Sequence, residues 1–176
     1  MEIKLDLACG DNKKEGFTGV DITQTSSTDV VWDLMKFPWP WVDESVDEIH
    51  CSHFVEHLPM VEVEGKDLFF KFFDECHRIL KPEGTMTVIV PNARCNRAFQ
   101  DPTHRRFIVA ETFLYLSKEW RDLNKLSHYN VQCDFSCNVD PIVPQELTLL
   151  HPEAQARRFN GEWNTILDWQ AKLIKK

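Results

Sequence analysis

The sequence predicts an α/β fold: a three-layer sheet of about seven strands, mostly parallel, with an antiparallel pair at one edge. In the first half of the chain, short apolar runs each end on a glycine, a carboxylate or a small polar residue. A long amphipathic segment then precedes a continuous apolar run. Two further short runs with strand-like patterns follow toward the C-terminus. This succession is typical of strands and helices that build one sheet.

The first two predicted strands lie close together in the sequence. Residues 3–7 alternate apolar and polar side chains and lead into Ala8, Cys9 and Gly10, and residues 17–22 form a second run that closes on Asp21. A parallel crossover usually takes a dozen or more residues, and the connecting segment is shorter than that. We therefore expect the first crossover helix to be vestigial or absent.

Two more strands follow, with an aromatic loop between them. Residues 30–32 form a run that ends at Asp33, and residues 46–51 form another that ends at Ser52. The intervening residues 37–41 are Phe-Pro-Trp-Pro-Trp. Proline fixes φ and lacks an N–H donor, which excludes a regular helix. We expect a loop packed by its own aromatic side chains.

The clearest helical pattern covers residues 65–80, where apolar residues recur on one helix face. Residues 81–84, Lys-Pro-Glu-Gly, should form a turn, because proline and glycine are typical just beyond a helix end. Residues 86–90 are almost entirely apolar and stop at Pro91 and Asn92. Such a run is typical of a strand buried on both faces of a parallel sheet.

The C-terminal half predicts two helices and two strands. Residues 103–120 have a helical pattern, and the chain is expected to end in an amphipathic helix over residues 159–173. Residues 131–137 and 146–150 have strand patterns and are joined through a segment with two prolines. We expect these two strands to pair antiparallel at the sheet edge.

Composition limits the number of domains and the class of partner. The 176 residues, of which 43% are hydrophobic, suffice for one core but not for two ordinary domains, so we expect one domain over residues 1–176. A net charge of -8 opposes binding to nucleic acid. No apolar run approaches the roughly 18 to 20 residues of a membrane span. The six cysteines form no CxxC pair, which is typical of reduced thiols, so a cytoplasmic protein is expected.

The residues that end the predicted strands indicate a nucleoside site. Ligands of open α/β sheets bind beyond the carboxyl ends of the strands, near the point where strand order reverses. Gly10 after the first strand allows close approach to the backbone, and Asp21 after the second can accept hydrogen bonds from both ribose hydroxyls. Asp33, Ser52 and Asn92 end the next three strands.

The glycine pattern indicates which class of nucleoside cofactor this site could bind. A dinucleotide fingerprint requires G-x-G-x-x-G, whereas this chain has Ala8, Gly10 and Lys13 at those positions. The missing first helix also removes the N-terminus that would hold a pyrophosphate. These features oppose a nicotinamide cofactor. S-adenosyl-L-methionine has no phosphate and is compatible with the short loop.

Five motifs in order resemble those of class I, Rossmann-like methyltransferases that depend on S-adenosylmethionine, in particular small bacterial and phage members with a reduced first helix. They are LDLACG at 5–10, GVDI at 19–22, DVVWDL at 29–34, SVDEIHCSHFVEHL at 45–58 and ECHRILKPEG at 75–84. Ala8 departs from the glycine that many members have. The resemblance implies a methyltransferase whose cofactor-binding residues are Ala8, Cys9, Gly10, Asp21, Ile22, Asp33, Leu34, Ser52 and His53.

The same resemblance implies how these residues divide over the cofactor. Backbone groups of Cys9 and Gly10 would face its methionine part, and Asp21 its ribose. Asp33 and Leu34 would lie by the adenine. Ser52 and His53 would lie near the sulfonium.

Residues 53–57, His-Phe-Val-Glu-His, also match the zinc-protease signature H-x-x-E-H. A metalloprotease would place this signature in a long helix and add a third ligand. Here the signature directly follows a strand, Pro59 interrupts any helix, and no third ligand is evident. We expect no metal; an alternative role for Glu56 and His57 is to cap and orient the loop.

Residues 101–106 concentrate charge just after the predicted fifth strand, where functional loops occur. His104 is the candidate catalytic residue, because an imidazole can accept the proton of a methyl acceptor. Arg105 and Arg106 are the candidate substrate-binding residues, suited to an anionic group. The alternative is a solvated helix start in which Asp101 or Thr103 is the N-cap.

Three functions remain open on the sequence alone. The first is methyl transfer to a small molecule, lipid or glycan precursor. The second is a non-catalytic, cofactor-binding or regulatory domain of the same fold. The third is another reaction of the same cofactor, such as lyase cleavage. No separate substrate-binding domain is evident, so the acceptor and the oligomeric state are not predicted.

Overall fold

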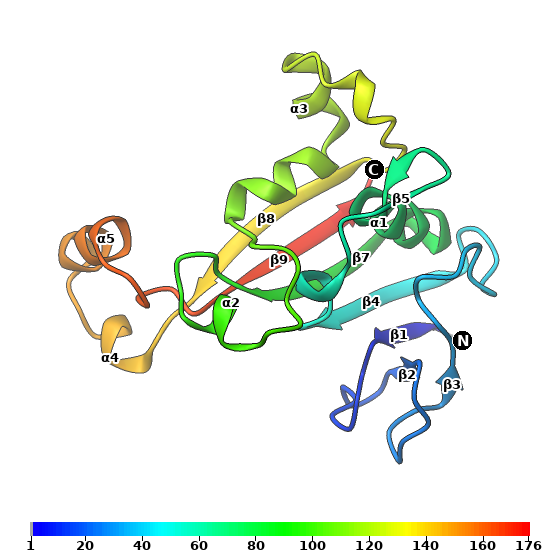
Figure 1. The fold of residues 1–176 in the computed structure, drawn as a ribbon, viewed down its shortest axis with the longest axis horizontal. Coiled ribbons are helices and arrows are strands. Elements are labelled where there is room, and N and C mark those ends of the chain that lie inside the picture. The colour runs from blue at the N-terminus through cyan, green and yellow to red at the C-terminus, as the bar shows by residue number, and fades with distance from the viewer. Residues whose placement is uncertain (1) are drawn as a thin grey trace.

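A computed structural model, which describes residues 2–176, contains one seven-stranded sheet in the order β3-β2-β1-β4-β7-β9-β8 (Figure 1). Neighbouring strands from β3 to β7 are parallel, while β9 is antiparallel to both β7 and β8. The predicted α/β class with antiparallel pairing near one edge is confirmed. The strands of the sheet are β1 (Lys4–Leu7), β2 (Thr18–Asp21), β3 (Val30–Val31), β4 (Val46–Ser52), β7 (Leu80–Pro91), β8 (Phe135–Ile142) and β9 (Asp168–Lys175).

Strand order reverses between β1 and β4. Strands β2 and β3 lie on one side of β1, whereas β4 and β7 lie on its other side. Residues 8–17, between β1 and β2, contain turns and no helix. The expectation of a missing first helix is therefore confirmed. The carboxyl ends of β1, β2, β3 and β4 consequently meet at one edge without a helix N-terminus between them.

Helix α1 (Leu68–Ile79) packs a buried apolar face into the hydrophobic core. Its N-terminus is capped by Asp67, whose side chain accepts a hydrogen bond from the backbone N–H of Phe69. Phe72 and Phe73 on its inner face are fully buried. The predicted helix started a few residues earlier; there the chain forms a small hairpin of β5 (Glu62–Val63) and β6 (Lys66–Asp67).

Strand β7 is longer than predicted and is not buried on both faces. The strand already begins at Leu80, so residues 81–84 lie within it and do not form the expected turn. The pairing with β4 is irregular there, because Leu80 pairs with Val46 but the next paired residue, Thr85, pairs with Glu48. Side chains then alternate, with Val88 and Val90 buried but Thr87 partly exposed. This alternation indicates that only one face of β7 is covered.

The helices cover one face of the sheet near β7, β8 and β9. Phe73 of α1 and Phe113 of the 3₁₀ helix Ala110–Leu116 lie in contact over this face, with ring centroids 6.5 Å apart. On the opposite face, strand register aligns a row of exposed residues: Thr85, Ser136, Asn138, Asp140, Lys172 and Ile174. Over these three strands, the expected third layer is absent from residues 2–176.

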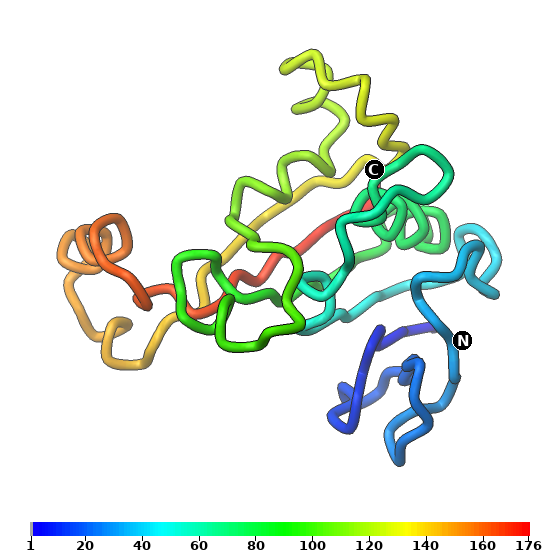
Figure 2. Tube along the Cα trace, viewed as in Figure 1, coloured from blue at the N-terminus to red at the C-terminus, as the bar shows by residue number. Residues whose placement is uncertain are grey.

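The C-terminal half differs most from the prediction. Residues 103–120 are a loop, the 3₁₀ helix and α3 (Lys118–Leu123) rather than one helix. Residues 146–150 lie largely in the short helix α4 (Gln145–Thr148) and not in a strand. Residues 159–173 divide between α5 (Pro152–Gly161) and β9, so β9 is the actual antiparallel partner of β8. Helices α4 and α5 lie beyond the end of the sheet, and β9 returns the chain to it (Figure 2).

The aromatic loop packs as expected. Trp39 is buried, and its backbone N–H donates to Oε1 of Glu75 on α1 over 2.6 Å. Its indole N–H donates to the carbonyl of Leu34 over 3.1 Å, and its ring contacts Phe72 edge to face. The loop thereby closes the core beside β3. Among residues 2–176, none of the helices has both the length and the apolar character required to cross a bilayer.

Gly19 in β2 tests how tightly the loop after β1 packs. A Cβ atom on Gly19 would lie 2.3 Å from the backbone oxygen of Ser27 and 2.9 Å from Sγ of Cys9. We expect Gly19→Ala to lower the free energy of unfolding by about 1 to 3 kcal/mol, measured by urea denaturation. Gly161→Ala is the control, because nothing lies within 4 Å of its added Cβ. Equal stability of Gly19→Ala and the parent would contradict the packing.

Candidate cofactor and acceptor site

A cavity of about 170 Å³ lies at the carboxyl ends of β1, β2 and β3. It is at the position where strand order reverses, as expected for a nucleoside site. Of its lining, the sequence predicted Ala8, Asp21, Ile22, Asp33 and Leu34 and missed Trp32, Met35 and Phe54. Trp32 and Phe54 lie within the motifs at 29–34 and 45–58, and Met35 directly follows the first of these, so the available signal was their place next to predicted positions.

Asp21 organises the loop that borders this cavity. Its Oδ2 accepts a hydrogen bond from the backbone N–H of Gly10 over 3.0 Å, and its Oδ1 accepts one from that of Thr23 over 2.9 Å. A carboxylate has about four acceptor positions, so further lone pairs remain for a ligand. Ala8 and Gly10 both have positive φ, 56° and 52°, which explains why glycine is common at the position of Ala8.

Cys9 and Asn92 face the protein rather than the cavity. The Cys9 side chain is buried, with Sγ 3.8 Å from the carbonyl oxygen of Ser27, so only its backbone could meet a ligand. Asn92 is buried; its Nδ2 donates to the carbonyl of Ile166 and its Oδ1 accepts from the indole of Trp169. Asn92 therefore joins the end of β7 to the segment entering β9.

A second cavity, of about 240 Å³, lies on the other side of the end of β4. Phe54 lines the first cavity and His53 lines the second, so the chain just after Ser52 separates the two. His53 has a positive φ of 53°, and its backbone N–H donates to Ile89 of β7 over 2.8 Å. The second cavity is lined by His53, Glu56, His57, Pro91, Arg97, Gln100, Asp101 and His104.

Glu56 is the most deeply buried ionisable group of the second cavity, with 1% of its surface exposed. Its Oε1 lies 3.2 Å from Nδ1 of His53 and 4.0 Å from Nε2 of His104. Its Oε2 has no hydrogen-bond partner among the described residues. The hydrogen bond with Glu56 raises the pKa of His53, against the opposing effect of burial. The cavity therefore favours positive charge next to Glu56.

Hydrogen bonds orient the two remaining imidazoles. Nδ1 of His104 lies 2.9 Å from the carbonyl oxygen of Ala98, which can only accept, so Nδ1 carries the proton. In neutral His104 the lone pair is then on Nε2, which faces Glu56. Nδ1 of His57 lies 3.0 Å from Oγ1 of Thr103, and that hydroxyl donates to Asp101 over 2.7 Å. The rings of His57 and His104 are in contact, with centroids 4.7 Å apart.

The arginines of the 101–106 loop do not join His104. The backbone N–H groups of Arg105 and Arg106 both donate to the carbonyl of Glu56, which fixes the loop against η1 (Val55–His57). The Arg106 guanidinium donates to the carbonyls of Leu58 and Pro59, and Arg105 is exposed. The guanidinium at the second cavity is that of Arg97, which pairs with buried Asp168. Burial raises the pKa of Asp168, and Arg97 opposes this effect.

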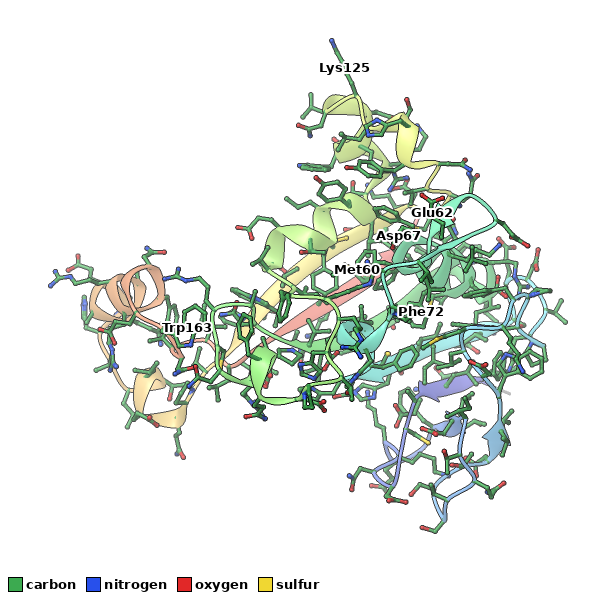
Figure 3. All side chains as sticks on the ribbon, in the orientation of Figure 1. Met60, Glu62, Asp67, Phe72, Lys125 and Trp163 are labelled. Atoms are coloured by element: carbon green, nitrogen blue, oxygen red, sulfur yellow. The ribbon has the colours of Figure 1, made fainter. Side chains whose placement is uncertain are left out.

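Arg106 instead lines a third, larger cavity of about 480 Å³ beside α1. Met60, Glu62 and Asp67 line the same cavity and lie close together in Figure 3. Asp67 forms an ion pair with Arg106 over 2.9 Å. Arg106 and His104 therefore line different cavities, Arg106 the third and His104 the second.

The sheet order defines a Rossmann-like fold, and a cavity lies at the strand reversal, where ligands of such sheets bind. A family model described as "Methyltransferase domain" matches residues 5–88, which include β1 to β4 and most of the strand-end residues. No curated protein matches the chain in sequence. The match over residues 5–88, together with the Rossmann-like fold, supports a methyltransferase of class I that uses S-adenosyl-L-methionine as its cofactor.

Solved structures share this fold. A SAM-dependent methyltransferase from Archaeoglobus fulgidus is 21% identical, with 99% of this chain and 86% of that chain covered and a TM-score of 0.66. A SAM-dependent methyltransferase from Methanosarcina mazei is 14% identical, with 99% and 92% covered and a TM-score of 0.54. A phosphoethanolamine N-methyltransferase 2 from Haemonchus contortus, solved with phosphomonomethylethanolamine and S-adenosylhomocysteine, is 12% identical, with 99% and 48% covered and a TM-score of 0.51.

Proposed function

We propose that the protein transfers the methyl group of S-adenosylmethionine to a small-molecule acceptor bound in the cavity lined by His53, Glu56 and His104. The observation that carries this proposal is the pair of cavities on either side of residues 53–54. A cofactor with its adenosine in the first cavity would present its sulfonium at the end of β4. An acceptor in the second cavity could then approach the methyl group in line, the geometry that contributes most to such a displacement.

The predicted cofactor-binding residues contact different parts of the bound S-adenosylmethionine. Asp21 accepts hydrogen bonds from the ribose hydroxyls, while Ile22, Asp33 and Leu34 border the adenine. Backbone groups at Ala8, Cys9 and Gly10 meet the methionine part, and Ser52 and His53 lie near the sulfonium. The lining of the first cavity supports the roles of Ala8, Asp21, Ile22, Asp33 and Leu34. The left-handed backbone at Ala8 and Gly10 supports the role of the turn after β1.

His104 takes the proton that the acceptor loses. Its Nε2 lone pair faces the cavity, and the buried Glu56 carboxylate stabilises the imidazolium that forms. We therefore expect an acceptor with an O–H or N–H nucleophile. An anionic part of the acceptor would bind Arg97, which lines this cavity, rather than Arg105 or Arg106, which do not.

The proposal is tested by incubating the protein with S-adenosylmethionine and pools of small acceptors that bear hydroxyl or amine groups. S-adenosylhomocysteine is measured by mass spectrometry, with each pool omitted in turn. We expect its formation to depend on one acceptor. Cofactor binding without turnover would favour a non-catalytic domain. Loss of S-adenosylmethionine without any acceptor, and without S-adenosylhomocysteine, would favour a lyase.

A further inference from the structure

The second cavity contains a cluster of three potential metal ligands. One ligand atom each from Glu56, His57 and His104 can be chosen so that all three lie within 4.8 Å of one another. From the sequence alone we expected no metal, in part because no third ligand was evident for the H-x-x-E-H signature. The loop 101–106 provides one, since its hydrogen bonds to the carbonyl of Glu56 bring His104 next to His57. We propose that Glu56, His57 and His104 bind a divalent transition-metal ion, with zinc as the best match.

The unpartnered carboxylate oxygen of Glu56 is an independent reason. Buried polar atoms almost always have a partner, because an unpaired one loses its hydration without compensation. Oε2 of Glu56 is buried, lacks a partner among the described residues, and belongs to a side chain that lines the cavity. The single hydrogen bond of Oε1 with His53 leaves most of the charge of this carboxylate uncompensated. A cation at the cluster would provide the missing partner.

The orientation of both imidazoles suits metal binding. A ligating histidine typically donates its other ring N–H to a carbonyl, carboxylate or other acceptor, which fixes the ring and its tautomer. Here Nδ1 of His104 is held by the carbonyl of Ala98, and Nδ1 of His57 by the hydroxyl of Thr103, which Asp101 holds in turn. Both Nε2 atoms are therefore left as potential ligands.

The donor set indicates which ion. Two imidazoles and one carboxylate form a zinc site that keeps one coordination position open. Bonds of about 2.0 to 2.2 Å place neighbouring ligands in a tetrahedral site roughly 3.3 Å apart, so the cluster must contract somewhat around the ion. The side chains of Glu56 and His104 are already buried, while His57 and the cavity give access from solvent. The open position would face the cavity.

Metal and proton compete for the same lone pair. If Nε2 of His104 coordinates the ion, it cannot also take a proton, so an ion would change how the acceptor is deprotonated. This consequence rests on the proposed function, whereas the metal site itself does not. Metal binding is therefore measured without cofactor or acceptor, so that failure of one proposal is distinguishable from failure of the other.

The experiment titrates the chelator-treated full chain with Zn²⁺ in competition with a chromophoric chelator. We expect saturable binding of one ion, and an affinity at least about tenfold lower in His57→Ala and in His104→Ala. His151→Ala is the control, because His151 is exposed and outside the cluster, and it should bind as the parent does. Circular dichroism establishes that each variant is folded.

A Co²⁺ spectrum of the parent identifies the ligand type even if a variant does not fold. We expect d–d bands of a nitrogen and oxygen site without a sulfur-to-metal charge-transfer band. Absence of saturable binding, a charge-transfer band from cysteine, or unchanged affinity in folded His104→Ala would each overturn the proposal.

Discussion

His104→Ala is expected to lower the rate of methyl transfer by about 10- to 1000-fold, the range for loss of a general base or a transition-state contact. His104 lines the second cavity and is not among the residues that line the first. Its removal should therefore leave the affinity for S-adenosylhomocysteine close to that of the parent. Single-turnover rates with the identified acceptor and calorimetry with S-adenosylhomocysteine measure the two quantities separately.

Two controls make this result specific to His104. Arg105→Ala alters an exposed neighbour on the same loop and should transfer methyl groups at the parent rate, in contrast to what the sequence alone predicts for Arg105. His151→Ala removes an exposed histidine far along the chain. A parent rate in His104→Ala would leave the loop with only a structural role. Equal losses of rate and affinity would instead indicate a damaged fold.

The N-terminal half was predictable because its signals are local. Each of the first four strands is a short apolar run that ends on a distinctive residue. In β1, β2 and β4 the apolar side chains are buried, as expected for strands of a parallel sheet. The location of Asp21 and Asp33 beside the first cavity was predictable for the same reason, because a residue that follows a strand lies at the edge of the sheet where that strand ends.

The C-terminal half was not predictable because its apolar residues fit two periods. Ile166 and Leu173 are compatible with a helix face, but Ala171 and Leu173 alternate with Lys172 and are buried between β7 and β8. Whether these residues form a helix or a strand depends on pairing with strands far away in the sequence, which a local pattern does not indicate. Alternation over residues 169–174 was the available signal.

The juxtaposition of Glu56 and His104 was likewise beyond local patterns. It depends on backbone hydrogen bonds from Arg105 and Arg106 to Glu56, which join segments with no shared periodicity. The sequence identified His104 as chemically suitable and His57 as part of a metal signature. Only the fold brings the two rings into contact.

Asp21→Ala is expected to weaken binding of S-adenosylhomocysteine by about 10- to 150-fold, which corresponds to the roughly 1.5 to 3 kcal/mol of a hydrogen bond to a charged group. The Asp21 carboxylate borders the first cavity and also accepts hydrogen bonds from the backbone of Gly10 and Thr23. Its removal would take away the proposed acceptor for the ribose hydroxyls and loosen the loop proposed to hold the methionine part. Isothermal titration calorimetry measures the affinity.

Asp11→Ala provides the matched control, because Asp11 is an exposed carboxylate on the same loop and does not line the cavity. It changes the net charge of the protein as Asp21→Ala does, so a general electrostatic effect would appear in both variants. Thermal unfolding compares their stability, since a loosened loop should lower the melting temperature only of Asp21→Ala. If Asp21→Ala binds S-adenosylhomocysteine as tightly as the parent and Asp11→Ala, Asp21 has no role in holding the ribose.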